Sequence, residues 1–226
     1  KWNYDSEIIG IDIPVVAVMG IGQNVQKFDL QLYLRSRFID KGYKVSQIGT
    51  KKISGLFGLH PLPDFLFNTQ YSDVDKVYAF NRVMKDVSMQ EKPDVILLGI
   101  PDSLLPLNNK HRFSFGLYAY EIFNAVQPDF VITSLMANDG YNDEFYSEIS
   151  KMAKYKYNVN IDAYFVSQFC PLSNSIWSEK LSYVYLPQME LPKTEYKVYT
   201  TSDLNNDILF KQAEKKLLLY GKYEQY

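Results

Sequence analysis

The chain has 226 residues, 46% hydrophobic and 22% charged, which is typical of a globular protein and excludes a disordered or collagen-like one. Its 24 lysines and arginines are outnumbered by 26 aspartates and glutamates, and the net charge of −2 argues against nucleic acid or an anionic membrane as a partner. No apolar run approaches the ~20 residues of a membrane-spanning helix, and the single cysteine, Cys170, excludes an internal disulfide and predicts a reducing, cytoplasmic location.

Short apolar runs alternate with amphipathic stretches from the start of the chain. The five apolar residues at 15–19 predict a strand that is buried on both faces. Apolar side chains recur every three to four positions over 27–41, which predicts a helix, and Gly42 stands where a left-handed cap would end it. Residues 43–48 alternate in polarity and predict a second strand.

The same pattern continues along the rest of the chain. A Pro-Asp pair precedes two of the later apolar runs, at Pro93 and Pro128, because proline ends a helix before the strand begins. The remaining predicted elements are, in order, a helix over 72–90, a strand at 95–98, a helix over 115–126, a strand at 130–132, a helix over 144–155, strands at 162–166 and 183–186, and a helix over 207–220.

Strands that alternate with helices predict an α/β fold, with a mainly parallel sheet flanked by helices. Right-handed crossovers place the loops after the strands at one edge of such a sheet, where ligands bind. We expect one α/β domain over residues 1–200 and a C-terminal helix, within 201–226, that packs on it or extends from it.

The loop from Gly20 to Lys27 is the strongest candidate site in the sequence. It lies between the first predicted strand and the first predicted helix. A glycine-containing loop and a lysine at this position hold phosphate, because backbone N–H groups and the helix N-terminus supply positive charge. Gly20 and Gly22 would shape the loop, Gln23 and Asn24 would line it, and Lys27 would supply the cation.

The loop departs from the standard pattern G-x-x-x-x-G-K-S/T. The spacing between Gly20 and Lys27 is one residue longer, and Gln26 replaces the second glycine. Phe28 replaces the hydroxyl residue that would bind Mg²⁺, and Asp29 adds a carboxylate that repels phosphate. The alternative interpretation is a loop whose glycines only form a strand-to-helix turn.

Two later loops complete the predicted site. Asp102, at the carboxyl end of the third predicted strand, is the candidate metal ligand, although its place after Pro101 also suits a turn. Asn138, in a Met-Ala-Asn-Asp-Gly segment after the fourth predicted strand, stands where related NTPases contact the base, and Asn-Asp-Gly is also a common loop sequence. Residues 50–52 contain two lysines that could contact an acidic ligand or remain solvated.

The longer spacing is similar to the phosphate loop of dethiobiotin synthetase and its relatives. More specifically, the sequence resembles a family of bacterial peptide-maturation-system proteins, which are encoded beside radical SAM enzymes and a Cys-rich precursor peptide. That family commonly has glycine at the position of Gln26 and threonine at that of Asp29. The resemblance covers about residues 14–140, and the segments that carry it are Gly20 to Arg35, Lys41-Gly42-Tyr43-Lys44-Val45, Gln47-Ile48-Gly49-Thr50 and Leu56-Phe57-Gly58.

The resemblance implies a P-loop NTPase-like fold with a degenerate phosphate loop, and a further domain before Lys1 in the full protein. It implies a non-catalytic or weakly nucleotide-binding accessory protein of ribosomal peptide maturation, whose partners are the precursor peptide or the maturation enzymes; a homodimer is left open. The alternative is an ATP- or GTP-dependent enzyme that activates a carboxylate, as dethiobiotin synthetase does. No catalytic residue is identified, and the candidate cofactors are ATP or GTP with Mg²⁺.

Overall fold

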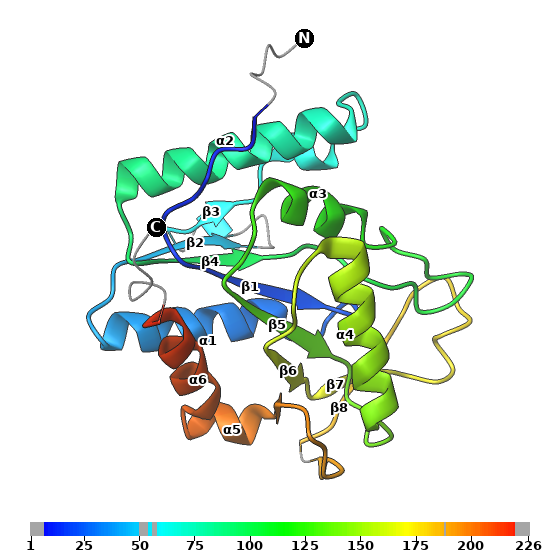
Figure 1. The fold of residues 1–226 in the computed structure, drawn as a ribbon. Helices are drawn as coiled ribbons and strands as arrows, with labels where there is room; N and C mark the ends of the chain where they lie inside the picture. Colours follow the sequence, from blue (N-terminus) through cyan, green and yellow to red (C-terminus); the bar gives the residue numbers. More distant parts are fainter. Residues whose placement is uncertain (1–6, 50–53, 56–57, 188, 220–226) are drawn as a thin grey trace.

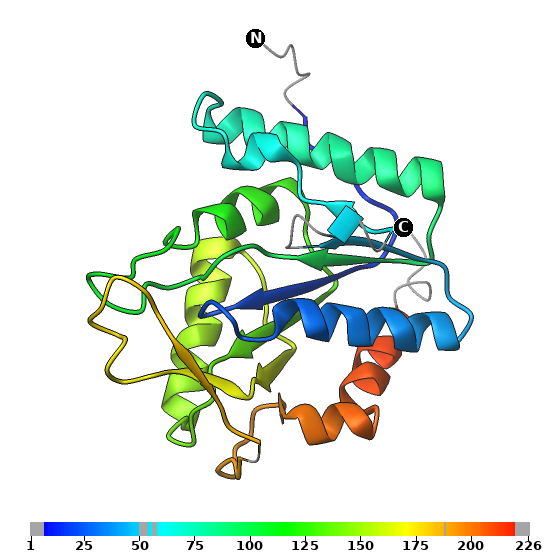
Figure 2. The same ribbon diagram turned by 180° about the vertical axis from the view of Figure 1, so that it is seen from behind.

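A parallel β-sheet between two layers of helices forms the centre of the computed structural model, which describes residues 7–49, 54–55, 58–187 and 189–219 (Figures 1 and 2). Seven strands follow the order β3-β2-β4-β1-β5-β6-β9, and every neighbouring pair is parallel. The predicted α/β fold is confirmed. The strands are β1 (Val15–Gly20), β2 (Val45–Gly49), β3 (His60–Pro61), β4 (Val95–Gly99), β5 (Phe130–Leu135), β6 (Ala163–Val166) and β9 (Val198–Tyr199).

Helices cover both faces of the sheet (Figure 1). One face carries α2 (Asp73–Glu91), α3 (Leu117–Ala125) and α4 (Asp143–Tyr157). The opposite face carries α1 (Lys27–Asp40) and α6 (Ile208–Leu217), and the short helix α5 (Thr201–Asn205) leads into α6. A 3₁₀ helix, η2 (Asp64–Phe67), precedes α2.

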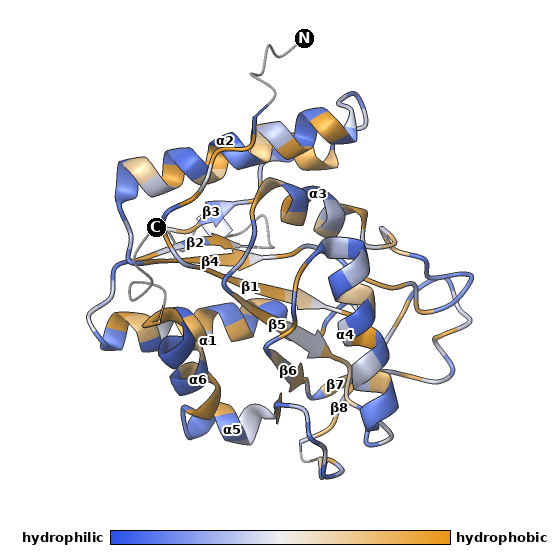
Figure 3. Ribbon diagram, viewed as in Figure 1, coloured by the Kyte–Doolittle hydropathy of each residue, from blue (hydrophilic) through white to orange (hydrophobic). Residues whose placement is uncertain are grey.

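The central strand β1 divides the hydrophobic core in two. Its side chains alternate, so that Val15, Ala17 and Met19 pack with α2, α3 and α4, while Val16 and Val18 pack with α1 and α6. All six residues of β1 are buried, which explains why the strand is an uninterrupted apolar run. Figure 3 shows the same hydrophobic character in β4 and β1 at the middle of the fold. No helix among the described residues is both long enough and apolar enough to cross a membrane.

An aspartate before each of three strands closes the amino edge of the sheet. Each carboxylate accepts a hydrogen bond from a backbone N–H near the start of the neighbouring strand. The bond gives that amide a partner where the hydrogen bonds between the two strands begin. These bonds explain the Pro-Asp pairs of the sequence as structural features. They join Asp94 to the Lys44 amide at 2.7 Å, Asp129 to the Val15 amide at 2.8 Å, and Asp162 to the Val131 amide at 2.9 Å.

The predicted strand at 183–186 exists but belongs to a different sheet. It forms β8 (Tyr183–Tyr185), which pairs antiparallel with β7 (Phe169–Pro171) in a separate two-stranded ribbon. The connection between β7 and β8 contains no helix, and a parallel pairing would need a crossover connection. The last strand of the main sheet, β9, follows this ribbon, and α6 then packs on the sheet.

We predict that Asp129→Ala lowers the free energy of unfolding by about 1–3 kcal/mol, because the Val15 amide loses its acceptor at the buried start of β1. Urea denaturation would measure the loss. Asp86→Ala removes an exposed carboxylate of α2 and should change stability by less than about 0.5 kcal/mol. Equal effects of the two substitutions would contradict the role given to Asp129.

Candidate functional site

The loop that joins β1 to α1 lies at the carboxyl edge of the sheet and is tied to the ends of two other strands. The Ile21 amide donates to the Ser134 carbonyl oxygen at 3.1 Å, and the Leu104 amide donates to the Gly20 carbonyl oxygen at 2.9 Å. The close packing around Gly20 leaves no room for a side chain, because a Cβ at this position would lie 2.7 Å from Cγ2 of Val25. The sheet therefore fixes where the loop begins.

Gln26 keeps a backbone conformation that glycine favours. It stands before the first residue of α1 with φ 55° and ψ 25°, in the left-handed region, and Asn24 also has a positive φ of 53°. The Gln26 side chain is directed to the end of β6, where its Oε1 accepts the Gln168 amide at 2.8 Å. Gln26 thus combines a glycine-like backbone conformation with a side chain that is bonded to the end of β6.

The loop offers a run of backbone donors to a pocket in front of α1. Within the described part of the chain, the amides of residues 22–27 donate to no acceptor. Since α1 begins at Lys27, the last of these amides also lies at the positive end of the helix dipole. The pocket has a volume of 320 Å³ and is lined by residues 24–29 together with Phe169 and Tyr183.

Lys27 also lines this pocket. The residue is half-buried, and its amine donates to the backbone carbonyl oxygen of Asp102. Burial lowers the pKa of Lys27 to about 8, and the negative charge of Asp102 opposes this shift. Among the described residues, the acceptor of this ammonium is a neutral carbonyl, and an ammonium bonds more strongly to an anion than to a neutral acceptor.

Asp102 holds the loop after β4 against the loop after β1. Its backbone has a positive φ of 57°, and its carboxylate accepts the Gln23 side-chain amide at 3.0 Å and the Ser114 backbone amide at 2.7 Å. The structure thus brings Gln23, Lys27 and Asp102 together, as the predicted site requires. These contacts also suit a turn residue, and the role of Asp102 as a metal ligand stays a prediction.

The chain offers phosphate a better fit than it offers a metal ion. Phe28 is buried and has no hydroxyl for Mg²⁺, and the exposed Asp29 adds a carboxylate to the pocket wall. Among the residues that the structure describes, no group of three or more His, Cys, Asp or Glu side chains could hold a metal ion. The donors of the loop are amides and an ammonium, which suit an anion.

Two other predicted contacts lie apart from this pocket or outside the described residues. Asn138 is exposed, and its side chain accepts the Gly140 amide at 2.8 Å in a turn after β5. Its contact with a base stays a prediction. Residues 50–52 and 56–57 lie outside the described residues.

Two cavities beside the loop were not predicted from the sequence. One has a volume of 410 Å³ and is lined by Gln23, Asn24 and residues of the 110–113 and 179–183 segments. The other, of 530 Å³, lies at the carboxyl ends of β6 and β9 and includes Gln168. Gln23 and Asn24 belong to the loop predicted from the sequence, and residues 166–168 lie at the end of the strand predicted at 162–166, whereas the segments at 110–113 and 179–182 have no regular periodicity.

Comparison with known proteins supports the fold. The sequence matches no protein-family model, and no curated protein matches it. The structure resembles that of a DUF1611 family protein from Anabaena variabilis, with a TM-score of 0.51 and 13% sequence identity, over 70% of this chain and 46% of that one. This chain therefore spans about half the length of that protein.

Two further solved structures are more distant. Cobyrinic acid a,c-diamide synthase from Mycobacterium smegmatis, with bound ADP and magnesium, has a TM-score of 0.43 and 15% identity over 68% of this chain and 74% of that one. A MobB protein homolog from Bacillus stearothermophilus has a TM-score of 0.39 and 12% identity over 90% of this chain and 97% of that one. The parallel sheet and the loop between β1 and α1 make the fold P-loop NTPase-like.

We predict that Lys27→Met raises the free energy of unfolding at pH 7 by about 1–3 kcal/mol, because a pKa lowered from 10.5 to about 8 means that the fold disfavours the buried charge. The unfolded chain binds this proton more tightly than the folded one. The stability of the unsubstituted protein should therefore rise between pH 8 and 10.5, and the gain from the substitution should shrink there. Lys41→Met, at the exposed end of α1, is the control. If urea denaturation instead gave Lys27→Met a lower free energy of unfolding than the unsubstituted protein, the amine would stabilise the fold and this prediction would be wrong.

We predict that Gln26→Gly binds inorganic pyrophosphate several-fold more tightly, because the anion can approach a glycine backbone more closely. Stability should change by less than about 1 kcal/mol, since relief of the left-handed conformation offsets the lost bond to Gln168. Calorimetric titration and urea denaturation measure the two quantities. Asn24→Gly, at the other left-handed position of the loop, is the control. Unchanged pyrophosphate affinity in Gln26→Gly would argue that this loop does not hold phosphate.

Proposed function

We propose that this chain binds the phosphate groups of a nucleotide at the loop of residues 20–27, and that it does so without efficient hydrolysis. The observation that carries the proposal is that Lys27 and residues 24–26, whose amides have no acceptor among the described residues, line one pocket at the N-terminus of α1. An anion in this pocket would pair with a charge that the protein otherwise keeps buried beside a neutral carbonyl.

The nucleoside half of the ligand would occupy the cavity of 530 Å³ at the ends of β6 and β9. Gln168 connects this cavity to the phosphate pocket, because its amide is bonded to Gln26 and its side chain lines the cavity. The walls combine apolar side chains and hydroxyl groups, which suit a base and a ribose, with one carboxylate, that of Glu190. The volume lies in the range of about 300–1,000 Å³ that is usual for small-molecule sites.

The absence of efficient catalysis follows from the residues around Lys27. Phe28 supplies no hydroxyl to a phosphate-bound Mg²⁺, and Asp29 faces the pocket with a charge that repels phosphate. Both carboxylate oxygens of Asp102 already accept hydrogen bonds within the protein. With these groups, the site is better suited to holding a nucleotide than to transferring a phosphoryl group.

The biological role that we propose is that of an accessory protein in the maturation of a ribosomally made peptide, with the precursor peptide or the maturation enzymes as partners. Only the sequence resemblance over residues 14–140 supports this role. An ATP- or GTP-dependent carboxylate-activating enzyme is the alternative, and it would require Mg²⁺-dependent turnover.

Calorimetric titration of ATP and GTP, with and without Mg²⁺, tests the proposal on the intact chain. We predict micromolar binding of at least one nucleotide, weakened at least tenfold by Lys27→Met. A bound phosphate raises the pKa of Lys27 above its free value of about 8, so the affinity should fall by up to tenfold per pH unit as the pH rises above 8.

Lys27→Arg is the matched control for the pH dependence. Its guanidinium stays charged throughout this range, and its nucleotide affinity should therefore not decline with pH. No binding of either nucleotide would overturn the proposal. Turnover that depends on Mg²⁺ would replace the accessory role with the enzymatic alternative.

A further inference from the structure

The cavity of 410 Å³ beside the phosphate loop is built from three segments that are distant in the sequence. Gln23 and Asn24 come from the loop before α1, residues 110–113 follow β4, and residues 179–183 lead into β8. The segments after β4 and between β7 and β8 lie side by side at one end of the molecule in both ribbon views (Figures 1 and 2).

Hydrogen bonds hold the two outer segments together. Three side chains of the segment after β4 contact three successive backbone carbonyls of the β7–β8 connection, and the Asn108 side chain also accepts the Lys110 and His111 amides at 2.8 Å each. The cavity therefore has walls fixed by specific bonds. The three contacts are Asn108 Nδ2 to the Ile176 oxygen at 2.9 Å, Lys110 Nζ to the Trp177 oxygen at 3.1 Å, and His111 Nε2 to the Ser178 oxygen at 3.0 Å.

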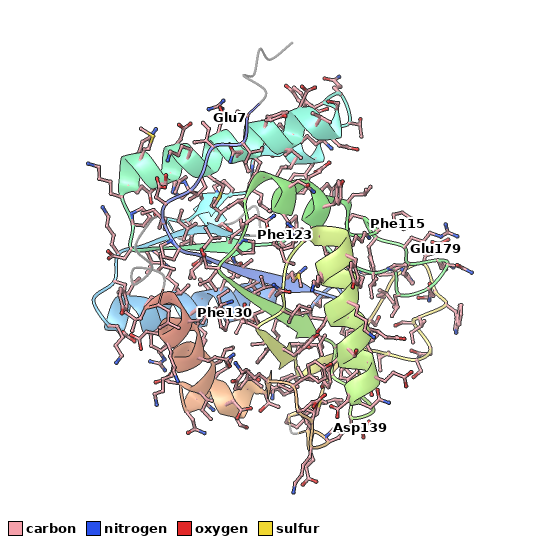
Figure 4. The ribbon with its side chains drawn as sticks, in the orientation of Figure 1. Glu7, Phe115, Phe123, Phe130, Asp139 and Glu179 are labelled. Atoms are coloured by element: carbon pink, nitrogen blue, oxygen red, sulfur yellow. The ribbon has the colours of Figure 1, made fainter. Side chains whose placement is uncertain are left out.

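The cavity concentrates positive charge in a chain whose net charge is −2. Lys110, Arg112 and Lys180 line it, against a single carboxylate from Glu179. Glu179 is exposed, as are the three cations, and Figure 4 labels it on the same side of the molecule as Phe115. Arg112 is oriented by a bond from its Nε to the Asn109 carbonyl oxygen at 3.0 Å, and a guanidinium matches the geometry of carboxylate and phosphate groups.

This cavity adjoins the phosphate pocket. The two share Asn24 and Tyr183 in their walls. We propose that the cavity is a second anion site, which binds a carboxylate or phosphate group of a small molecule held next to the nucleotide. This inference rests on the proposed function for the identity of the neighbouring ligand.

The test uses ¹H–¹⁵N NMR titrations of the intact chain with inorganic phosphate and with succinate. A Lys27→Met background removes the cation of the phosphate loop, so that the response comes from the second site. We expect saturable shifts of the amides of residues 110–113 and 179–183 with at least one of the two anions. The combined substitution Arg112→Ala and Lys180→Ala should weaken this binding at least tenfold.

Two controls separate charge from folding. Arg112→Lys keeps the charge and should retain binding within about threefold, since a lysine still pairs with the anion as a point charge. Lys211→Ala with Lys215→Ala removes the same number of charges from α6 and should leave binding unchanged. A succinate response without a phosphate response identifies a carboxylate ligand, and the reverse identifies a phosphate.

The inference fails if neither anion gives saturable shifts at these amides, or if the double substitution at Arg112 and Lys180 leaves binding unchanged. The proposed function fails separately, when the chain with Lys27 intact binds no ATP or GTP. Nucleotide binding without a response to either anion would therefore support the proposed function and contradict the second anion site. A response to an anion without nucleotide binding would support the second site and contradict the proposed function.

Discussion

Complete burial of β1 between β4 and β5 is the constraint from which the geometry of the site follows. The strand has neighbours on both sides and helices on both faces, so its end at Gly20 has no freedom to shift. The loop that follows is bonded to the Ser134 carbonyl within one residue and must turn in the space left by a missing side chain. The core thus positions the amides that face the pocket.

Several features that are unfavourable in isolation lie at the carboxyl edge of the sheet. Asn24, Gln26 and Asp102 have left-handed backbones, and Lys27 has a buried ammonium. A non-glycine residue in this region is disfavoured by about 1 kcal/mol or more, and the structure retains it only when its surroundings compensate. Here the compensation is specific, because Gln26 bonds to Gln168 and both Gln23 and Lys27 bond to Asp102. Strain of this kind, gathered at the ligand-binding edge of a fold, is more typical of a site than of a connecting turn.

The parts of the fold that could be predicted are those that local sequence determines. The helix predicted over 27–41 is observed as Lys27–Asp40, because its apolar period and the glycine after it are both local signals. The strands at 15–19 and 95–98 were found for the same reason. By contrast, β9 has two residues and is defined only by its partner β6 across the sheet, which no local pattern records.

The candidate site likewise has features that local sequence predicts and features that it does not. Spacing and glycines predicted the loop of residues 20–27 as a site, and the carboxyl end of a strand predicted Asp102, because both signals depend on chain order; the structure places these residues in contact. The left-handed conformation of Gln26 could not be predicted, since glutamine rarely adopts it. The contacts of Lys110 and His111 with residues 177–178 also arise only when two irregular segments meet in the folded chain. Asn138 lies in a loop-forming sequence that does make a turn, in which its Oδ1 accepts the Gly140 amide.

The state of the donors explains how a loop without its usual glycine and hydroxyl could still hold an anion. The Lys27 amine already has an acceptor, so a phosphate would gain only the difference between a charged and a neutral partner. The amides of residues 22–27 have no acceptor within the described chain, so each new bond to a ligand would replace a bond to water. Binding would then depend on the summed amides and on the charge of Lys27, and neither depends on the Mg²⁺ ligand that Phe28 has replaced. A loop of this kind separates the recognition of phosphate from its transfer, because recognition needs donors in place while transfer needs a metal and a reacting group in register with them.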